Sequence, residues 1–179
     1  TAAVNADTIK VAPGSFVGGV VVNKSVSVLG NQAGVDATSR TGVPETVVQF
    51  DTTAVFQLTG RDALIDGFTI QAIFTGAQPM AVGVLTSNGE SGYSILNNKI
   101  TGASSSSFGA TAGLKLSSES VHPVLVKGNT IAGGFLTTGL SAPGIDISVG
   151  FADATIEENS ISTQNATGIT INSPAEGQM

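Results

Sequence analysis

The chain has 179 residues, of which 41% are apolar and only 11% are charged, with 23 glycines and no cysteine or tryptophan. That length suits a single domain with its own core, and seven basic residues on a net charge of −6 exclude a basic patch for nucleic acid. The lack of cysteine excludes disulfides and cysteine-ligated metal sites, and no apolar run reaches the roughly 18–20 residues of a membrane span.

Four segments align without gaps and predict a repeated strand. They are LIDGFTIQA (64–72), SILNNKITG (94–102), LVKGNTIAG (125–133) and TIEENSIST (155–163). Their first inward positions are β-branched and spaced by 30, 31 and 30 residues: Ile65, Ile95, Val126 and Ile156. Five residues later each segment has an isoleucine: Ile70, Ile100, Ile131 and Ile161. The constant offset indicates stacked copies of one structural unit.

A second set of short strands is predicted between the first. These are VFQLT (55–59), AVGVLT (81–86), AGLKLS (112–117), PGIDIS (143–148) and TGITIN (167–172). Apolar residues alternate within each, as strands with one buried face require. We align Phe56, Val82, Leu114, Ile145 and Ile169, with the Val82 alignment open to a slip of one residue. Helical periodicity is nearly absent, apart from a short segment at residues 2–6.

A repeat of 24–31 residues that carries two or three short strands is typical of a solenoid. We therefore predict an all-β fold, a right-handed parallel β-helix (solenoid) of about five to six coils. A left-handed form would need a hexapeptide apolar period, which the sequence lacks. Residues 1–179 are predicted to form one β-helix domain, with a tail at residues 174–179.

The opening DTIKVAPGSF (7–16) and VVVNKSVSVLGNQAG (20–34) resembles the first coil of bacterial β-helix repeat proteins of the pectate-lyase-like superfamily. The later I-x-x-N-x-I segments are similar to that family's repeat. The resemblance implies that residues 1–6 are the remnant of an N-terminal capping helix. It also implies that GNQAGVDATSRTG (30–42), which contains Arg40, is the long loop that ends the first coil.

Asparagines recur at one point of the repeat, at Asn98, Asn129 and Asn159, with Phe68 in the earlier copy. Asparagine tolerates the left-handed backbone of a tight bend, and stacked amides hydrogen-bond to one another. We predict a structural asparagine ladder and not a binding site.

No catalytic constellation, metal site or cofactor site is predicted. The outward column Asp66, Leu96, Lys127 and Glu157 mixes charges, which predicts pairing and not convergence on a cation. The resemblance raises the possibility of polygalacturonase-like chemistry. That chemistry needs an Asp-Asp pair, a Gly-His and an Arg-x-Lys, but the sequence has no adjacent aspartates and a single histidine, His122. An enzyme is therefore the less favoured interpretation.

Three predicted loops leave the repeat at the same point, and each carries a phenylalanine: Phe74, Phe108 and Phe135. These rings either seal the edge of the core or form a shallow apolar surface. Together with Tyr93, they are the candidate residues for contact with a ligand or partner.

Three functions are compatible with the sequence. The favoured one is a secreted or cell-surface structural and interaction module, part of a larger adhesin, appendage or surface assembly. Such a module could stack end to end, because uncapped strand edges invite pairing. The alternatives are a polysaccharide lyase or epimerase-like enzyme and a non-catalytic glycan-binding module. The expected partners are a further copy of the chain or a surface polysaccharide, outside the cell or at its surface.

Overall fold

The computed structural model describes residues 2–51, 53–73, 80–86, 91–102, 110–117, 122–132, 144–148, 154–163 and 167–172. Regular structure within these ranges consists of eighteen β-strands, with no helix. Accordingly, no helix in the described part of the chain could cross a membrane.

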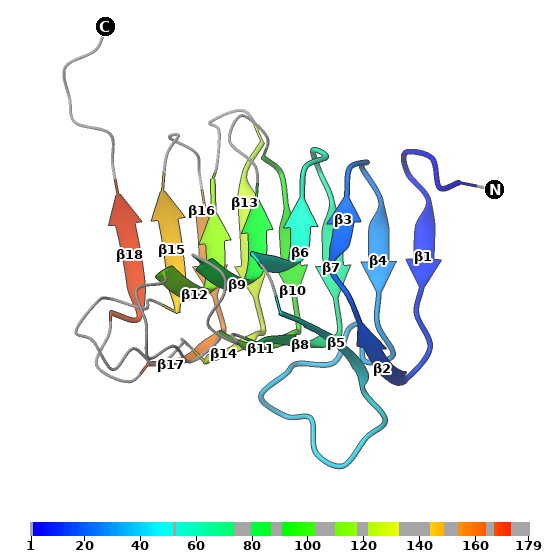
Figure 1. The fold of residues 1–179 in the computed structure, drawn as a ribbon, viewed down its shortest axis with the longest axis horizontal. Coiled ribbons are helices and arrows are strands. Elements are labelled where there is room, and N and C mark those ends of the chain that lie inside the picture. The colour runs from blue at the N-terminus through cyan, green and yellow to red at the C-terminus, as the bar shows by residue number, and fades with distance from the viewer. Residues whose placement is uncertain are drawn as a thin grey trace, which may run out of the picture.

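The strands form three six-stranded parallel sheets, and each strand pairs with the strand three places later in the chain. The chain therefore visits the first, second and third sheets in turn, six times; we call each visit to all three a round. Successive rounds lie side by side along the long axis, with β1 and β18 toward opposite ends of that axis (Figure 1).

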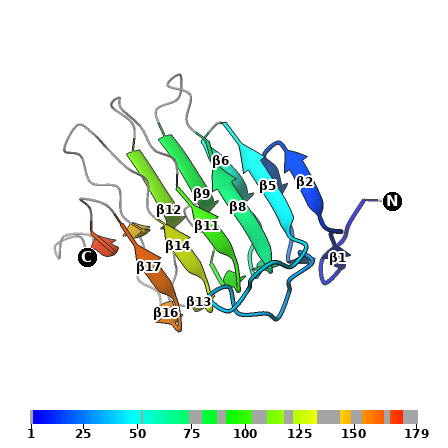
Figure 2. The same ribbon diagram turned by 90° about the horizontal axis from the view of Figure 1, so that it is seen from below.

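The strand bounds are as follows. The first sheet contains β1 (Thr8–Lys10), β4 (Ser27–Leu29), β7 (Leu64–Asp66), β10 (Ser94–Leu96), β13 (Val124–Lys127) and β16 (Ala154–Glu157). The second sheet, seen face-on in Figure 2, contains β2 (Gly14–Val17), β5 (Thr46–Phe50), β8 (Phe68–Ala72), β11 (Lys99–Thr101), β14 (Thr130–Ala132) and β17 (Ser160–Ser162). The third sheet contains β3 (Val20–Val22), β6 (Ala54–Leu58), β9 (Met80–Thr86), β12 (Ala110–Leu116), β15 (Ile145–Ser148) and β18 (Ile169–Asn172).

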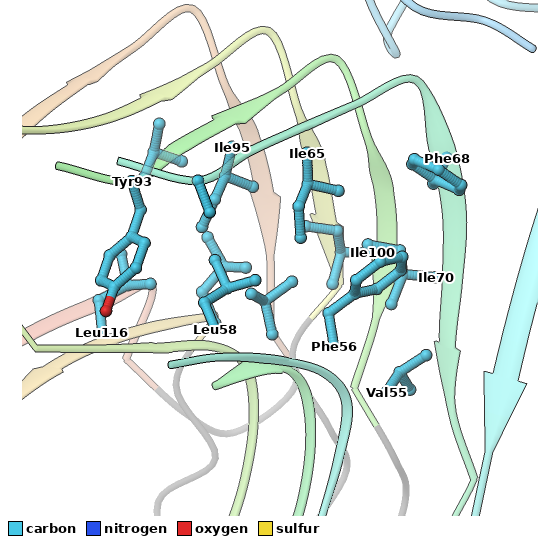
Figure 3. Close-up of a cluster of buried hydrophobic side chains, with 14 of the residues drawn as sticks. Val55, Phe56, Leu58, Ile65, Phe68, Ile70, Tyr93, Ile95, Ile100 and Leu116 are labelled. Atoms are coloured by element: carbon cyan, nitrogen blue, oxygen red, sulfur yellow. The ribbon is translucent and has the colours of Figure 1, made fainter. Parts of the chain in front are cut away.

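The two predicted isoleucine columns are confirmed by the strand register. Ile65, Ile95, Val126 and Ile156 pair in sequence across the first sheet. Ile70, Ile100, Ile131 and Ile161 do so across the second sheet. The side chains of Ile65, Ile70, Ile95 and Ile100 point into the space between the sheets (Figure 3). There the rings of Phe56 and Phe68 meet edge to face with their centroids 5.3 Å apart. This interior is the hydrophobic core.

The register of the third sheet differs from the prediction at one strand. Val84, and not Val82, pairs with Phe56 and Leu114, while Val82 pairs with Ala54 and Ala112. The displacement is two residues because side chains alternate between faces, so a slip of one would expose the buried set. Ile145 and Ile169 continue the column as predicted.

The bend between the first and second sheets uses a left-handed residue immediately before the asparagine column. The backbone φ is +78° at Gly67, +50° at Asn97, +67° at Gly128 and +55° at Glu158. The prediction that the column asparagines themselves take this conformation is therefore wrong. The preceding residue makes the turn, and the column residue, whose side chain faces inward, supplies hydrogen bonds.

The column asparagines form a continuous hydrogen-bonded ladder. Asn98 Oδ1 accepts the N–H of Phe68 at 2.9 Å, and Asn129 Oδ1 accepts the N–H of Asn98 at 2.8 Å. Asn159 Oδ1 accepts the N–H of Asn129 at 2.9 Å. The amide nitrogens of Asn98 and Asn129 donate to the carbonyls of Ile65 and Ile95, one round earlier. The ladder thus pairs backbone groups that the strands leave unpaired at the bend.

The N-terminal segment is a turn and not the end of a helix. Val4 N–H donates to Asp7 Oδ2 at 2.8 Å, and Asp7 N–H donates to the Val4 carbonyl at 3.2 Å. Ala6 N–H donates to the Ser25 carbonyl, and Ala3 packs against the core. The helical conformation expected for residues 2–6 is therefore wrong: this short segment forms a turn that lies beside the neighbouring round. The predicted tail at 174–179 lies outside the described residues.

We predict that Asn129→Ala lowers the free energy of unfolding by about 3 kcal/mol, because it leaves at least two buried backbone groups without partners. Chemical denaturation monitored by circular dichroism measures the change. Asn159→Ala is the matched control: Asn159 is only half-buried at the end of the ladder, so its loss should be clearly smaller. Equal losses at the two positions would contradict a burial-dependent ladder.

Candidate functional site

The two ends of the sheets are the most exposed apolar regions that the structure describes. At one end the outermost strands are β1, β2 and β3, and at the other they are β16, β17 and β18. Inward columns that are buried in the middle rounds become accessible here. Ile9 is 38% exposed and Phe16 is 44% exposed, although Val28 and Val48, their partners in the next round, are buried.

The end formed by the first round is hollowed. An open cavity of about 640 Å³ is lined mainly by apolar side chains, including Ala3, Ile9, Phe16, Val20, Val28 and Phe56. Its polar lining residues include Asn23 and Lys24, near its rim. An apolar hollow of this kind, bordered by strand edges, fits a partner that supplies apolar side chains together with strands.

The opposite end presents the same inward columns. Ile169 is 39% and Ile171 is 70% exposed, whereas Ile145 and Ile147, their partners in the preceding round, are buried. Ile156 and Ile161 are half-buried and pack against the core. Both ends therefore combine aliphatic side chains with outermost strands.

A charged cluster occupies the outer face of the second sheet. Glu45 accepts hydrogen bonds from Arg40 at 3.0 Å, Thr69 at 3.2 Å and Lys99 at 3.4 Å. Arg40 also donates to the Phe68 carbonyl at 3.2 Å, and Lys99 donates to the Arg40 carbonyl at 3.0 Å. The guanidinium and the ammonium thus share one carboxylate.

Arg40 is buried although it lies on a loop. Its side chain is 0% exposed, and burial lowers the pKa of the guanidinium while the Glu45, Asp66 and Asp36 carboxylates act in the opposite direction. The loop between β4 and β5, which stands out from the body in Figure 1, is held by Gly34 N–H, which donates to Asp66, and by Ala37 N–H, which donates to the Gly128 carbonyl. Arg40 therefore helps to hold this loop against the bend between the first and second sheets.

Two further contacts join basic and acidic side chains of different rounds. His122 Nδ1 lies 3.0 Å from Asp62 Oδ1, so the single histidine of the chain has a carboxylate neighbour. Lys127 Nζ lies 2.9 Å from Glu157 and 3.3 Å from Glu158. Hydrogen bonds to these carboxylates raise the pKa of Lys127, so its ammonium group stays protonated to a higher pH than that of an unpaired lysine.

The predicted site residues have different outcomes. Tyr93 is 0% exposed and points into the core (Figure 3), so the prediction that it contacts a ligand is wrong. The physical reason is strand alternation: Tyr93 lies two residues before Ile95, on the inward face. Phe74, Phe108 and Phe135 lie outside the described residues. Asn98, Asn129 and Asn159 form the ladder described above.

The sequence suggests contact through the ends of the fold but gives no indication of the Glu45 cluster. The clustering of Arg40, Glu45 and Lys99 depends on how a loop folds over strands more than 50 residues further along the chain, and no local pattern encodes that. The cluster contains a single carboxylate, and no group of three or more metal-ligating side chains is found among the described residues. No family model, curated protein or solved structure matches the chain.

We predict that Glu45→Ala lowers the free energy of unfolding by about 3 kcal/mol, because it removes the carboxylate that pairs directly with the buried Arg40 guanidinium. Arg40 Nε is already buried without a hydrogen-bond partner among the described atoms, and the Phe68 carbonyl, which also accepts from Arg40, is uncharged. Lys99→Met is the control, since Lys99 keeps 34% of its side chain exposed; its effect should stay below about 1 kcal/mol. A milder loss for Glu45→Ala than for Lys99→Met in urea unfolding would overturn this account.

Proposed function

We propose that the chain is a right-handed parallel β-helix of six coils that acts as a structural and interaction module outside the cell or at its surface. The pairing of every strand with the strand three places later supports a solenoid. Crossovers between parallel strands are right-handed in about 98% of cases, which supports the hand. The resemblance of residues 7–34 to the pectate-lyase-like superfamily agrees with this architecture.

The observation that carries the proposal is the accessible apolar interior at the ends. Soluble domains rarely leave core columns uncovered, and uncovered strand edges pair with other chains unless they are blocked. Here Ile9, Phe16 and Ile171 are accessible beside outermost strands. Association through the ends, within a larger adhesin, appendage or surface assembly, would remove this exposure.

The charge distribution supports a role without catalysis. Catalytic acids and bases need side chains that are free to exchange protons with a substrate. The charged groups of the Glu45 cluster and the Lys127 cluster instead pair with one another. The outward face of the second sheet is otherwise composed mostly of small or neutral side chains such as Thr69, Gln71 and Thr101. Such a surface suits a scaffold.

Protease treatment of intact cells of the source organism tests the proposed location. We expect the chain, followed by an antibody, to be digested on intact cells or recovered from the medium, while a cytoplasmic marker survives until lysis. Recovery of the chain only after lysis would reject a surface module.

A polysaccharide lyase or epimerase-like enzyme is the second candidate, favoured by one observation. Lys99 and Glu45 place a basic and an acidic group together on the outer face of the second sheet. Such groups can act as general base and general acid in removing the proton next to a sugar carboxylate. Assays on a panel of acidic polysaccharides, with and without calcium, test it. If this candidate is right, turnover appears in the wild type and falls at least about a hundredfold in Lys99→Ala. No turnover on any substrate would leave the structural role.

A further inference from the structure

We propose that the partner of each end is a second copy of the chain, stacked head to tail so that the last round of one copy continues into the first round of the next. The inference rests on the proposed function, because it names the partner through which such a module associates. Contacts of this kind use different surfaces on the two copies and generate open filaments unless the rotation closes a ring.

The register of the sheets predicts which residues would meet. Extending the first-sheet column by one strand brings Ile156 of one copy onto Ile9 of the next. In the second sheet Ile161 meets Phe16. These are residues whose exposure is otherwise unexplained, and in each case an apolar side chain covers another. Burial of both surfaces favours the contact through the hydrophobic effect.

The third sheet gives the same match. Its column runs from Val20 through Phe56 to Ile145 and Ile169, and a neighbouring column ends at Ile171. Stacking in register would place Ile169 of one copy next to Val20 of the other, and Ile171 next to Val22. Ala2 and Ala3 already line the hollow at the first-round end, which leaves less room for contact through the third sheet. The first and second sheets therefore carry most of the proposed contact.

The charged residues at the two ends of the first sheet favour the same arrangement. Lys10 and Glu157 are the two end members of one outward column, whose other members are Leu29, Asp66, Leu96 and Lys127. Stacking in register would set Glu157 of one copy one strand spacing, about 4.8 Å, from Lys10 of the next. The pairing of Lys127 with Glu157 at 2.9 Å shows that neighbours in this column reach one another.

Strand direction also favours head to tail over head to head. The three sheets are parallel throughout. When the last round of one copy meets the first round of the next, the new strand pairs are also parallel, and the outermost strands of both copies supply unpaired backbone groups for them. Two first rounds facing each other would instead pair strands antiparallel and bring the basic rims, each with Lys10 and Lys24, together.

Cysteine cross-linking tests the contact and its register, because the chain has no cysteine of its own. Ser15 and Ser160 are exposed and lie at the two ends of one outward column. Within one chain they are five strand spacings apart, about 24 Å, but across the proposed contact they would be neighbours within the Cα range of a disulfide, about 4.4–6.8 Å.

Equimolar S15C and S160C are mixed and oxidised mildly, and covalent dimers are quantified on denaturing gels. We expect the mixture to give at least about tenfold more dimer than S15C alone, or than S15C mixed with S162C, which lies two residues out of register. Dimer from S15C alone at the same yield would show head-to-head contact. Equal yield with S162C would reject the register, and no dimer in any mixture would reject stacking.

Sedimentation velocity over a concentration series provides a second measurement. We expect the mass of the wild-type chain to rise with concentration and Phe16→Lys, at the second-sheet contact, to weaken association at least about tenfold. Val35→Lys is the matched control, because Val35 is 42% exposed but lies on the long loop, away from both ends. Circular dichroism checks that both variants fold. Equal association of all three proteins, or a monomer at every concentration, would overturn the inference.

The outcomes for stacking and for the proposed function are separable. A monomer that is accessible to protease on intact cells would reject stacking and leave the surface module standing, with a different partner at its ends. Cross-linked filaments of a chain that is protected until lysis would reject the surface role and leave stacking standing.

Discussion

Stacking of like side chains at one strand spacing is the constraint on which this structure depends. Each inward residue rests on its counterpart in the neighbouring rounds, about 4.8 Å away. Most inward columns are therefore apolar along their length, as from Ile65 to Ile156, and a buried polar member such as Thr86 is hydrogen-bonded. A slip of one residue in any strand would place polar side chains in the core, which is why the register is strict. The bends, the loops and the two ends all occupy positions that this register determines.

The bend between the first two sheets shows how a polar interior follows from the same constraint. A sharp bend interrupts the backbone ladder and leaves buried donors and acceptors that cost free energy when unpaired. An asparagine has both a donor and an acceptor, so one residue per round can pair with the rounds on both sides. Asn98 and Asn129 are wholly buried yet hydrogen-bonded, and burying a polar side chain is tolerated under that condition.

The sequence predicts the columns well because periodicity within a strand and repetition between strands report the same contacts. It predicts less where either signal fails. In β9, Val82 and Val84 are both apolar and on the same face, so alternation alone cannot choose between registers two residues apart. Tyr93 was treated as a possible surface aromatic from its residue type, although its parity with Ile95 places it inside. The Glu45 cluster has no sequence signal, because it forms between a loop and the second sheet.

The scarcity of charge has a consequence at the ends of the columns. In a stacked arrangement like charges in successive rounds would lie about 4.8 Å apart and repel each other, so charged residues are few and meet opposite partners, as Lys127 meets Glu157. A column that avoids like charges within the chain also has matching residues at its two ends. Inward columns end in apolar residues at both ends, and the outward column that begins at Lys10 ends at Glu157. Natural strand edges usually avoid pairing through charges that point inward, prolines or covering segments. In the first and last rounds the inward residues Ile9, Phe16, Ile169 and Ile171 are aliphatic or aromatic and carry no such charges. The rule that specifies the interior therefore also makes each end a template for the other.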